Sequence, residues 1–330
     1  PLYMTRASGN RRLAVQATVL LVLIGGALYV ASRDDKLDKT TLYFSAAPVQ
    51  VGDAPQSIAV GEGGVWVTNG GDATVSRLDE STRKTTGDAI PVEPIPNGIV
   101  AGEGSVWVGF GEGSETILRI DPLTERVAQR IRIGRSPSAL AIGEGGVWVA
   151  ALVGDVVARV NPATGAVESK LGGKELQFPA AVAVGLGSVW VADVVSDEVV
   201  ELDPVSLEVL DRTQVGVSPT ALTVGEGYVW VANFDGTVTR IDPEEGNKTK
   251  VIPIGYEPGA LAVGEGFVWV TAPKQDAVVR IDVSTGKTVG QAIPVGDNPQ
   301  GIAYGSGNMW IANQGDDTVT RIDLHPDEHE

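Results

Sequence analysis

From residue 42 onwards the chain repeats one pattern of apolar and polar positions seven times. Each copy has a strand of small residues, a Gly-x-Gly turn, an apolar strand centred on tryptophan and two further strands. In the fifth copy the four strands are residues 221–224, 228–233, 237–242 and 248–254. No segment of this part has the three-and-four apolar spacing that a helix of about ten residues needs. The pattern therefore predicts an all-β chain.

Tryptophan marks the repeat, because every tryptophan of the chain occupies the same place in its copy. The seven are Trp66, Trp107, Trp148, Trp190, Trp230, Trp269 and Trp310, and neighbours are 39 to 42 residues apart. A period of roughly 40 to 45 residues is typical of one four-stranded propeller blade. Identical placement in every copy is what a shared core requires. We therefore predict a seven-bladed β-propeller with the tryptophans buried between blades.

The ends of the repeat predict how the ring closes. The seventh copy stops after its third strand, at residues 318–323, whereas residues 42–51 resemble the fourth strand of other copies. An N-terminal strand that completes the last blade would leave no unpaired edge. This closure orients the molecule. We call the side with the Gly-x-Gly turns and the turns between third and fourth strands the near face, on which the chain arrives. The opposite side, with the remaining loops, is the far face.

Residues 13–31 form a run without a charged side chain, after Arg6, Arg11 and Arg12 and before Asp34 and Asp35. As a helix this run would be about 28 Å long, close to the hydrocarbon thickness of a bilayer. Arginines before it predict that the N-terminus lies inside the cell and the propeller outside. The alternative is a cleaved secretory signal, with Val30 and Ser32 as the small residues before the cleavage site.

These segments give the predicted domain organisation. Residues 1–12 would be a short cytoplasmic segment, 13–31 a transmembrane helix, 32–41 a tether, 42–324 the propeller and 325–330 an acidic tail. A cytoplasmic signalling domain before Pro1 is left open.

Charge and composition exclude several functions. All 42 acidic residues and all but three of the 25 basic residues follow residue 31, so this part has a formal charge of −20. Such a surface repels nucleic acid and anionic lipid. The chain has no cysteine, and its two histidines, His325 and His329, lie in the acidic tail. The repeats therefore lack the usual nucleophile–base pairs and zinc ligands.

Arginine occupies one position of the third strand in six copies, at Arg77, Arg119, Arg159, Arg240, Arg280 and Arg321. The fourth copy has Glu201 there instead. Such regularity indicates a structural role, and we expect the arginines to pair with carboxylates, such as Asp72, Asp155, Asp235 or Asp276, within or between blades.

The far-face loops differ from copy to copy, whereas the near-face turns barely change. Because binding residues are often found on variable loops of a rigid scaffold, the far face is the candidate surface for a ligand or partner. Its candidate residues are Phe110, Arg135, Phe178, Phe234, Tyr256 and Lys274. Neutral drift of solvent-exposed loops would explain the same variation.

The copies Trp66-Val67-Thr68-Asn69, Trp230-Val231-Ala232-Asn233 and Trp310-Ile311-Ala312-Asn313, each followed by a Val-x-Arg-Ile/Leu-Asp strand, resemble YVTN-type β-propeller repeats over residues 42–324. Similar repeats occur in streptogramin lyases of the virginiamycin B lyase type, in exported surface propellers and behind bacterial transmembrane kinases. The resemblance implies the fold and leaves the function open. For a lyase it would imply a histidine base, a glutamate and magnesium on the central face, and residues 1–324 contain no histidine.

Two functions follow from these observations. The first is a membrane-anchored, extracytoplasmic, monomeric propeller that binds or senses a protein, small molecule or polymer on its far face. It would have no catalytic residue, cofactor or metal. The second is a lyase-like or lactonase-like enzyme that uses carboxylates and a divalent cation at the mouth of the central channel.

Overall fold

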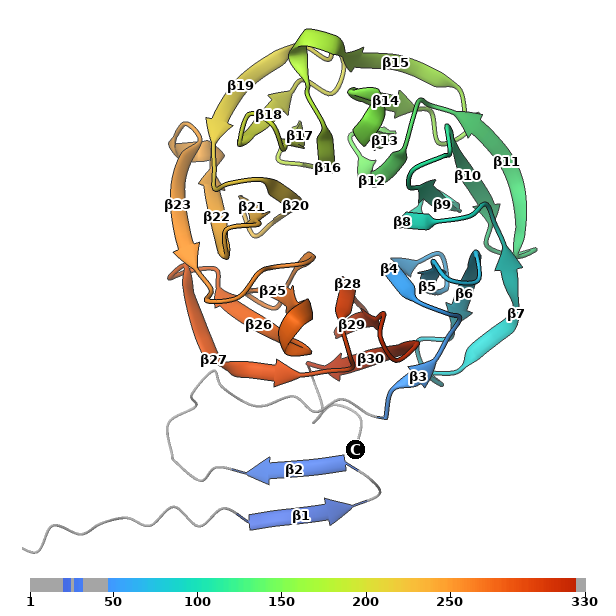
Figure 1. Ribbon diagram of the computed structural model, residues 1–330, viewed down its shortest axis with the longest axis vertical. Coiled ribbons are helices and arrows are strands. Elements are labelled where there is room, and N and C mark those ends of the chain that lie inside the picture. The colour runs from blue at the N-terminus through green and yellow to red at the C-terminus, as the bar shows by residue number, and fades with distance from the viewer. Residues whose placement is uncertain (1–19, 25–26, 32–46, 325–330) are drawn as a thin grey trace, which may run out of the picture.

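The computed structural model describes residues 20–24, 27–31 and 47–324 of the chain. Residues 47–324 form seven four-stranded antiparallel sheets arranged as blades around a central axis (Figure 1). Between residues 47 and 324, the helical segments are four short 3-10 turns, so the prediction of an all-β, seven-bladed propeller is confirmed. These turns are η1 (Leu152–Gly154), η2 (Gly173–Glu175), η3 (Pro243–Glu245) and η4 (Pro273–Gln275).

Each blade runs from an inner strand beside the axis to an outer strand at the rim. Blades one to three contain β4 (Pro55–Gly61), β5 (Gly64–Asn69), β6 (Thr74–Leu78), β7 (Thr85–Pro91); β8 (Pro96–Gly102), β9 (Ser105–Phe110), β10 (Thr116–Asp121), β11 (Arg126–Arg132); β12 (Pro137–Gly143), β13 (Gly146–Ala151), β14 (Val156–Val160) and β15 (Val167–Gly172). Blades four and five contain β16 (Pro179–Gly185), β17 (Ser188–Asp193), β18 (Glu198–Leu202), β19 (Val209–Gln214); β20 (Pro219–Gly225), β21 (Tyr228–Asn233), β22 (Thr237–Asp242) and β23 (Lys248–Pro253). Blade six contains β24 (Leu261–Gly264), β25 (Phe267–Ala272), β26 (Ala277–Asp282) and β27 (Lys287–Pro294), and blade seven contains β28 (Pro299–Gly305), β29 (Asn308–Asn313), β30 (Thr318–Asp323) and β3 (Val49–Gln50).

Residue size follows the wedge shape of the blades. Inner strands approach one another so closely that a Cβ atom on Gly98 would lie 2.1 Å from the carbonyl oxygen of Ser138 in the next blade. A Cβ atom on Gly301 would likewise lie 2.9 Å from the carbonyl oxygen of Gln56. All seven tryptophan side chains, one strand further out, are completely buried. Each packs in a core shared by two neighbouring blades, as the repeat predicted.

The N-terminal strand closes the ring. β3 pairs antiparallel with β30, with Val49 opposite Val319 and Gln50 opposite Thr318. The backbone N–H of Val51 donates to the carbonyl oxygen of Asp317 at 2.9 Å, which extends the contact by one bond. The closing strand is shorter than the predicted span of 42–51, of which residues 42–46 lie outside the described part. Because the contact is brief, packing of Val49 and Val51 against the core between blades seven and one supports it.

The segment before the propeller differs from the predicted helix at residues 13–31. β1 (Leu20–Ile24) and β2 (Ala27–Ala31) pair antiparallel there, with Leu20 opposite Ala31. Periodicity cannot distinguish a buried helix from strands in a continuous apolar run, and Gly25-Gly26 is a typical two-residue hairpin sequence. In the described residues, no helix is long and apolar enough to cross a membrane. The remainder of 13–31, the predicted tether and the two histidines lie outside the described residues.

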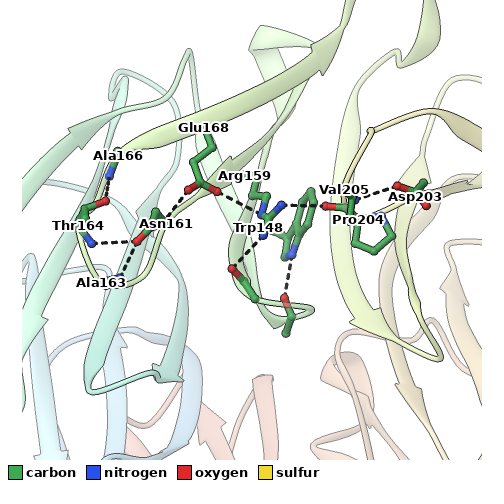
Figure 2. A network of polar contacts seen from close by, with 12 residues as sticks. Trp148, Arg159, Asn161, Ala163, Thr164, Ala166, Glu168, Asp203, Pro204 and Val205 are labelled. Carbon is green, nitrogen blue, oxygen red and sulfur yellow. Dashed lines mark hydrogen bonds and ion pairs between the residues drawn. The ribbon is translucent and has the colours of Figure 1, made fainter.

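Five of the six repeated arginines connect their blade to the next, as Figure 2 shows for Arg159. Its guanidinium lies over the ring of Trp148, 5.8 Å from the ring centre, and donates to the carbonyl oxygen of Pro204 in the next blade at 3.2 Å. Equivalent bonds join Arg77 to Pro122, Arg119 to Ala163, Arg240 to Val283 and Arg321 to Glu80. The predicted pairing with carboxylates is found at three of the arginines, which form ion pairs with Glu125, Glu168 and Asp323. The particular partners predicted, Asp72, Asp155, Asp235 and Asp276, were wrong. Those aspartates follow the second strands on the far face, at the opposite end of the third strand.

Glu201, which replaces the arginine in the fourth blade, also bonds to the next blade, but it accepts the hydrogen bond instead of donating it. Glu201 accepts a hydrogen bond from Asn247 Nδ2 of the fifth blade at 2.9 Å. Its other oxygen accepts from the hydroxyl of Ser188 at 2.7 Å. A carboxylate and an amide therefore replace the guanidinium and carbonyl found elsewhere.

Candidate binding surface and central cavity

The loops that lead into the inner strands share one backbone conformation on the far face. In six of them the residue before the conserved proline has a positive φ, between 51° and 60°: Ala54, Ile95, Ser136, Phe178, Ser218 and Asn298. In four cases the backbone N–H of that residue donates to an aspartate of the preceding blade, at 2.7 to 2.9 Å. The pairs are Ala54 with Asp317, Phe178 with Asp155, Ser218 with Asp197 and Asn298 with Asp276. These four far-face loops are therefore held by hydrogen bonds to their backbone.

Exposed apolar side chains gather on the far face of blades three to five. We call this set the apolar arc: Val153, Phe178, Val195, Val217, Phe234 and Tyr256, all at least one third exposed. Phe234 is 57% exposed and Phe178 is 47% exposed. An aromatic side chain in the left-handed region is unusual, since Gly, Asn and Asp adopt this region most readily. The fold thus places Phe178 at a position where a smaller residue would be less strained.

Although Asp155, Asp197 and Asp235 lie on blades three to five, far-face aspartates are most numerous on blades six, seven and one. We call this set the acidic arc: Asp276, Asp297, Asp316, Asp317, Asp53 and Asp72. The carboxylates of Asp316 and Asp72 accept from the backbone N–H groups of Asp297 and Asp53, at 3.3 and 3.2 Å. The charge of Asp276 raises the pKa of Asp297 above its ordinary value, and burial, a hydrogen bond with Asp276 and the charge of Asp316 act in the same direction. The raised pKa of Asp297 therefore results mainly from the neighbouring negative charges on this side of the ring.

Five of the six predicted site residues lie on the far-face surface. Phe178, Phe234 and Tyr256 belong to the apolar arc, and Arg135 is exposed on the loop that leads into blade three. Lys274 is exposed beside Tyr256 but forms an ion pair with Glu257. Whether these five bind a partner stays a prediction.

Phe110 was wrongly assigned to this surface, because its side chain is completely buried in the core between blades one and two. It ends β9, and the equivalent last residues of the other tryptophan strands, such as Asn69 and Ala151, are buried as well. The strand therefore extends one residue further than the sequence indicated.

Sequence reasoning did not identify the acidic arc or the three valines. A signal was present: the loops Val51-Gly52-Asp53, Val215-Gly216-Val217 and Val295-Gly296-Asp297 align within the repeat. The residue after the glycine is acidic at Asp53 and Asp297, apolar at Val217 and basic in the equivalent loop of blade three, at Arg135. Comparing this position across the copies would have revealed Asp53, Asp297 and Val217, but not Val153 or Val195, which lie in other loops.

The near face has a cavity of about 570 Å³ at the central channel, lined by the ends of β20, β24 and β28. Glu226, Glu265 and Tyr304 supply its side-chain polar groups. The hydroxyl of Tyr304 donates to Glu265 Oε1 at 2.6 Å. This hydrogen bond, burial and the charge of Glu265 raise the pKa of Tyr304 to about 12.

The carboxylates of the near face are partly engaged in joining blades. Glu62 accepts from the backbone N–H of Gly104 in the next blade at 2.9 Å. Within the described ranges, no group of three or more His, Cys, Asp or Glu side chains is arranged to hold a metal ion. A second cavity, of about 460 Å³, lies where the rims of blades five and six meet, between Tyr256 and Gln291.

Solved structures place the chain in the class of β-propellers. A streptogramin B lyase structure is 17% identical, with a TM-score of 0.70 over 84% of this chain and 96% of that chain. A catalytically inactive virginiamycin B lyase from Staphylococcus aureus with quinupristin is 16% identical, with a TM-score of 0.71 over 84% and 98%. Kuenenia stuttgartiensis hydrazine synthase is 15% identical, with a TM-score of 0.73 over 84% and 97%. These likenesses show the fold alone. Neither a protein-family profile nor a curated protein sequence matches the chain.

Proposed function

We propose that this protein is a non-enzymatic binding or sensing module and that its partner docks on the far face. The observation that carries the proposal is the apolar arc, in which Phe178 and Phe234 are exposed on loops held by hydrogen bonds to their backbone and Tyr256 is exposed beside the Phe234 loop. Exposed apolar side chains scattered singly are common, whereas a continuous group marks an interaction site. Fixed loops also reduce the entropy lost on binding.

An extracytoplasmic location and attachment to the membrane are part of this proposal. The uncharged run of residues 13–31 and the three arginines before it support export by a membrane-directed segment. Protease added to intact cells should degrade the propeller. Protection of the propeller until the cells are lysed would refute this location.

The docking surface can be tested with a random peptide display library, which does not presuppose the chemistry of the ligand. The full chain is compared with Phe234→Ser and Tyr256→Ser on the far face. Leu123→Ser and Val205→Ser are matched controls, because these side chains are 93% and 80% exposed on near-face turns. A buried aromatic anchor contributes about 1 to 3 kcal/mol, so binding of selected peptides should fall about tenfold or more in the far-face variants only. Equal loss in the controls, or no selected peptide, would refute the far-face site.

The second candidate function is an enzyme at the near-face cavity. The observation in its favour is the pair of carboxylates, Glu226 and Glu265, beside the hydroxyl of Tyr304 in a cavity large enough for a small ligand. The lyase neighbours share only the fold. If this enzyme used a divalent cation, magnesium should raise the melting temperature and a chelator should lower it. On the binding function that we propose, neither treatment changes the melting temperature.

A further inference from the structure

We propose that the far-face partner is a basic polypeptide segment with apolar side chains, which contacts the apolar and acidic arcs together. This inference rests on the proposed binding function and names the chemistry of the partner. It follows from two features of this face: aspartates occur around most of the ring, including Asp235 beside Phe234, and exposed apolar side chains concentrate on blades three to five. In Figure 1, the blades of the apolar arc (β12–β23) occupy the top and left of the ring, and those of the acidic arc the bottom and right.

The loops of the apolar arc are joined to one another by hydrogen bonds and close contacts. Phe178 donates its N–H to Asp155, two residues after Val153, and its carbonyl oxygen accepts from Val194 at 3.3 Å. In the next blade the N–H of Phe234 donates to the carbonyl oxygen of Val217 at 3.0 Å. The loop of Phe234 then meets Tyr256, since the carbonyl carbon and oxygen of Tyr256 lie against Gly236.

The acidic arc continues from the point where the apolar arc ends. The side chains of Asp276 and Asp317 hold the loops of the following blades, through Asn298 and Ala54. Asp53 and Asp297 are different: they are exposed, follow the glycine of the repeated loop and occupy the same position as Val217 and Tyr256. Their carboxylates are therefore available for charge complementarity with a ligand.

The character of the two arcs selects one class of partner. Anionic ligands such as nucleic acid or acidic lipid are repelled by the aspartates. An uncharged ligand would leave the carboxylates without a counter-charge. A small organic cation could satisfy one arc only, because each arc extends over three blades. A polypeptide carrying lysine or arginine and apolar side chains can cover both, and its apolar side chains supply affinity while its charges supply orientation.

Binding of a synthetic probe tests this inference with the full chain. The probe is a peptide of about twelve residues that alternates lysine with leucine and serine. In two matched peptides, glutamate replaces every lysine or serine replaces every leucine. We expect the probe to bind at least tenfold more tightly than either matched peptide and to weaken as salt is added. Equal binding of the glutamate peptide, or no binding of the probe, would overturn the inference.

Two substitutions test the acidic arc directly. Asp53→Asn and Asp297→Asn remove one charge each and should weaken probe binding about two- to fivefold. Asp88→Asn is the matched control, because Asp88 is exposed on the outer strand β7, away from the far face. The control should leave probe binding unchanged. If Asp53→Asn and Asp297→Asn also leave it unchanged, the acidic arc does not bind the peptide.

The two proposals fail in different ways. If library-selected peptides lose binding in Phe234→Ser but are neither basic nor sensitive to Asp297→Asn, the far face binds and the basic partner is refuted. If no far-face substitution affects any peptide, both proposals are refuted.

Discussion

Arg159 should stabilise the propeller through the next blade and through Trp148 rather than through its ion pair. Its Nη1 and Nη2 donate to the carbonyl oxygens of Pro204 and Gly145, each at 3.2 Å. Its Nε lies 3.4 Å from Glu168 Oε2, and the Arg159 and Glu168 side chains are 21% and 37% exposed (Figure 2). We compare Arg159→Leu, which keeps an apolar stem over Trp148, with Glu168→Gln.

The magnitudes separate the two variants. Two hydrogen bonds from a charged donor at a partly exposed site contribute about 1 kcal/mol each, and the contact with the indole face adds about 0.5 to 1 kcal/mol. Arg159→Leu should therefore lower the free energy of unfolding by about 2 to 3 kcal/mol. A partly exposed ion pair contributes about 0 to 1 kcal/mol. Asn161 Nδ2 donates to Glu168 Oε1 at 2.8 Å, and a glutamine oxygen can still accept this hydrogen bond. Glu168→Gln should therefore lower the free energy of unfolding by less than about 1 kcal/mol.

Urea denaturation measures both costs, provided that the dependence of the free energy on urea is unchanged. Arg159→Lys is the informative third variant. It keeps the charge but loses the planar fork, so it should show most of the Arg159→Leu loss. If Glu168→Gln were as destabilising as Arg159→Leu, or if Arg159→Lys were neutral, the ion pair would carry the stability and the interblade account would be refuted.

Three further predictions concern closure and titration. Deleting residues 1–51 removes β3 and the hydrogen bond between Val51 and Asp317. In calorimetry the domain should then melt in a broader, less cooperative transition. An unchanged transition would contradict closure by this strand. The pKa of Tyr304 is raised, so its contribution to the stability of the fold is complete below pH 10 and is lost as the pH rises to about 12. In alkaline denaturation, Tyr304→Phe should not show this loss of stability. The pKa of Asp297 is also raised, which means that its charge is unfavourable in the folded state. Asp297→Asn should therefore raise the melting temperature at pH 7 but not at pH 3, and a decrease at pH 7 would refute the repulsion.

The sequence predicts the ring well because one physical requirement is repeated in every copy. Trp66 and its six equivalents must fill the space between blades, and the small inner residues, such as Gly98, must fit near the axis. Each copy independently confirms the period. Closure was also predictable, since the last copy lacks one strand and the residues before the first copy supply it.

Other features were not predictable because they depend on direction or on contacts between copies. The apolar run of residues 13–31 has no period that distinguishes a helix from the hairpin of β1 and β2. Phe110 lies at the boundary of a strand and a loop, and a shift of one residue moves a side chain from the surface to the core. The partners of Arg159 are backbone carbonyls, one of its own blade and one of the next, which no pattern of side chains reveals.

On both faces most bonds between blades join a side chain of one blade to the backbone of the next, and this explains where the sequence can vary. On the near face Arg159 donates to a backbone carbonyl, whereas Glu201 bonds to the side chain of Asn247, so a change at Glu201 requires a matching change at Asn247. On the far face, Asp155, Asp197, Asp276 and Asp317 bond to the backbone N–H of the next loop, whatever its side chain. Substitutions there leave the bond intact. The far face can therefore hold Asp at 53 and 297 and Val at 217 on the same backbone, which is the property that a scaffold needs in order to present a ligand-specific surface.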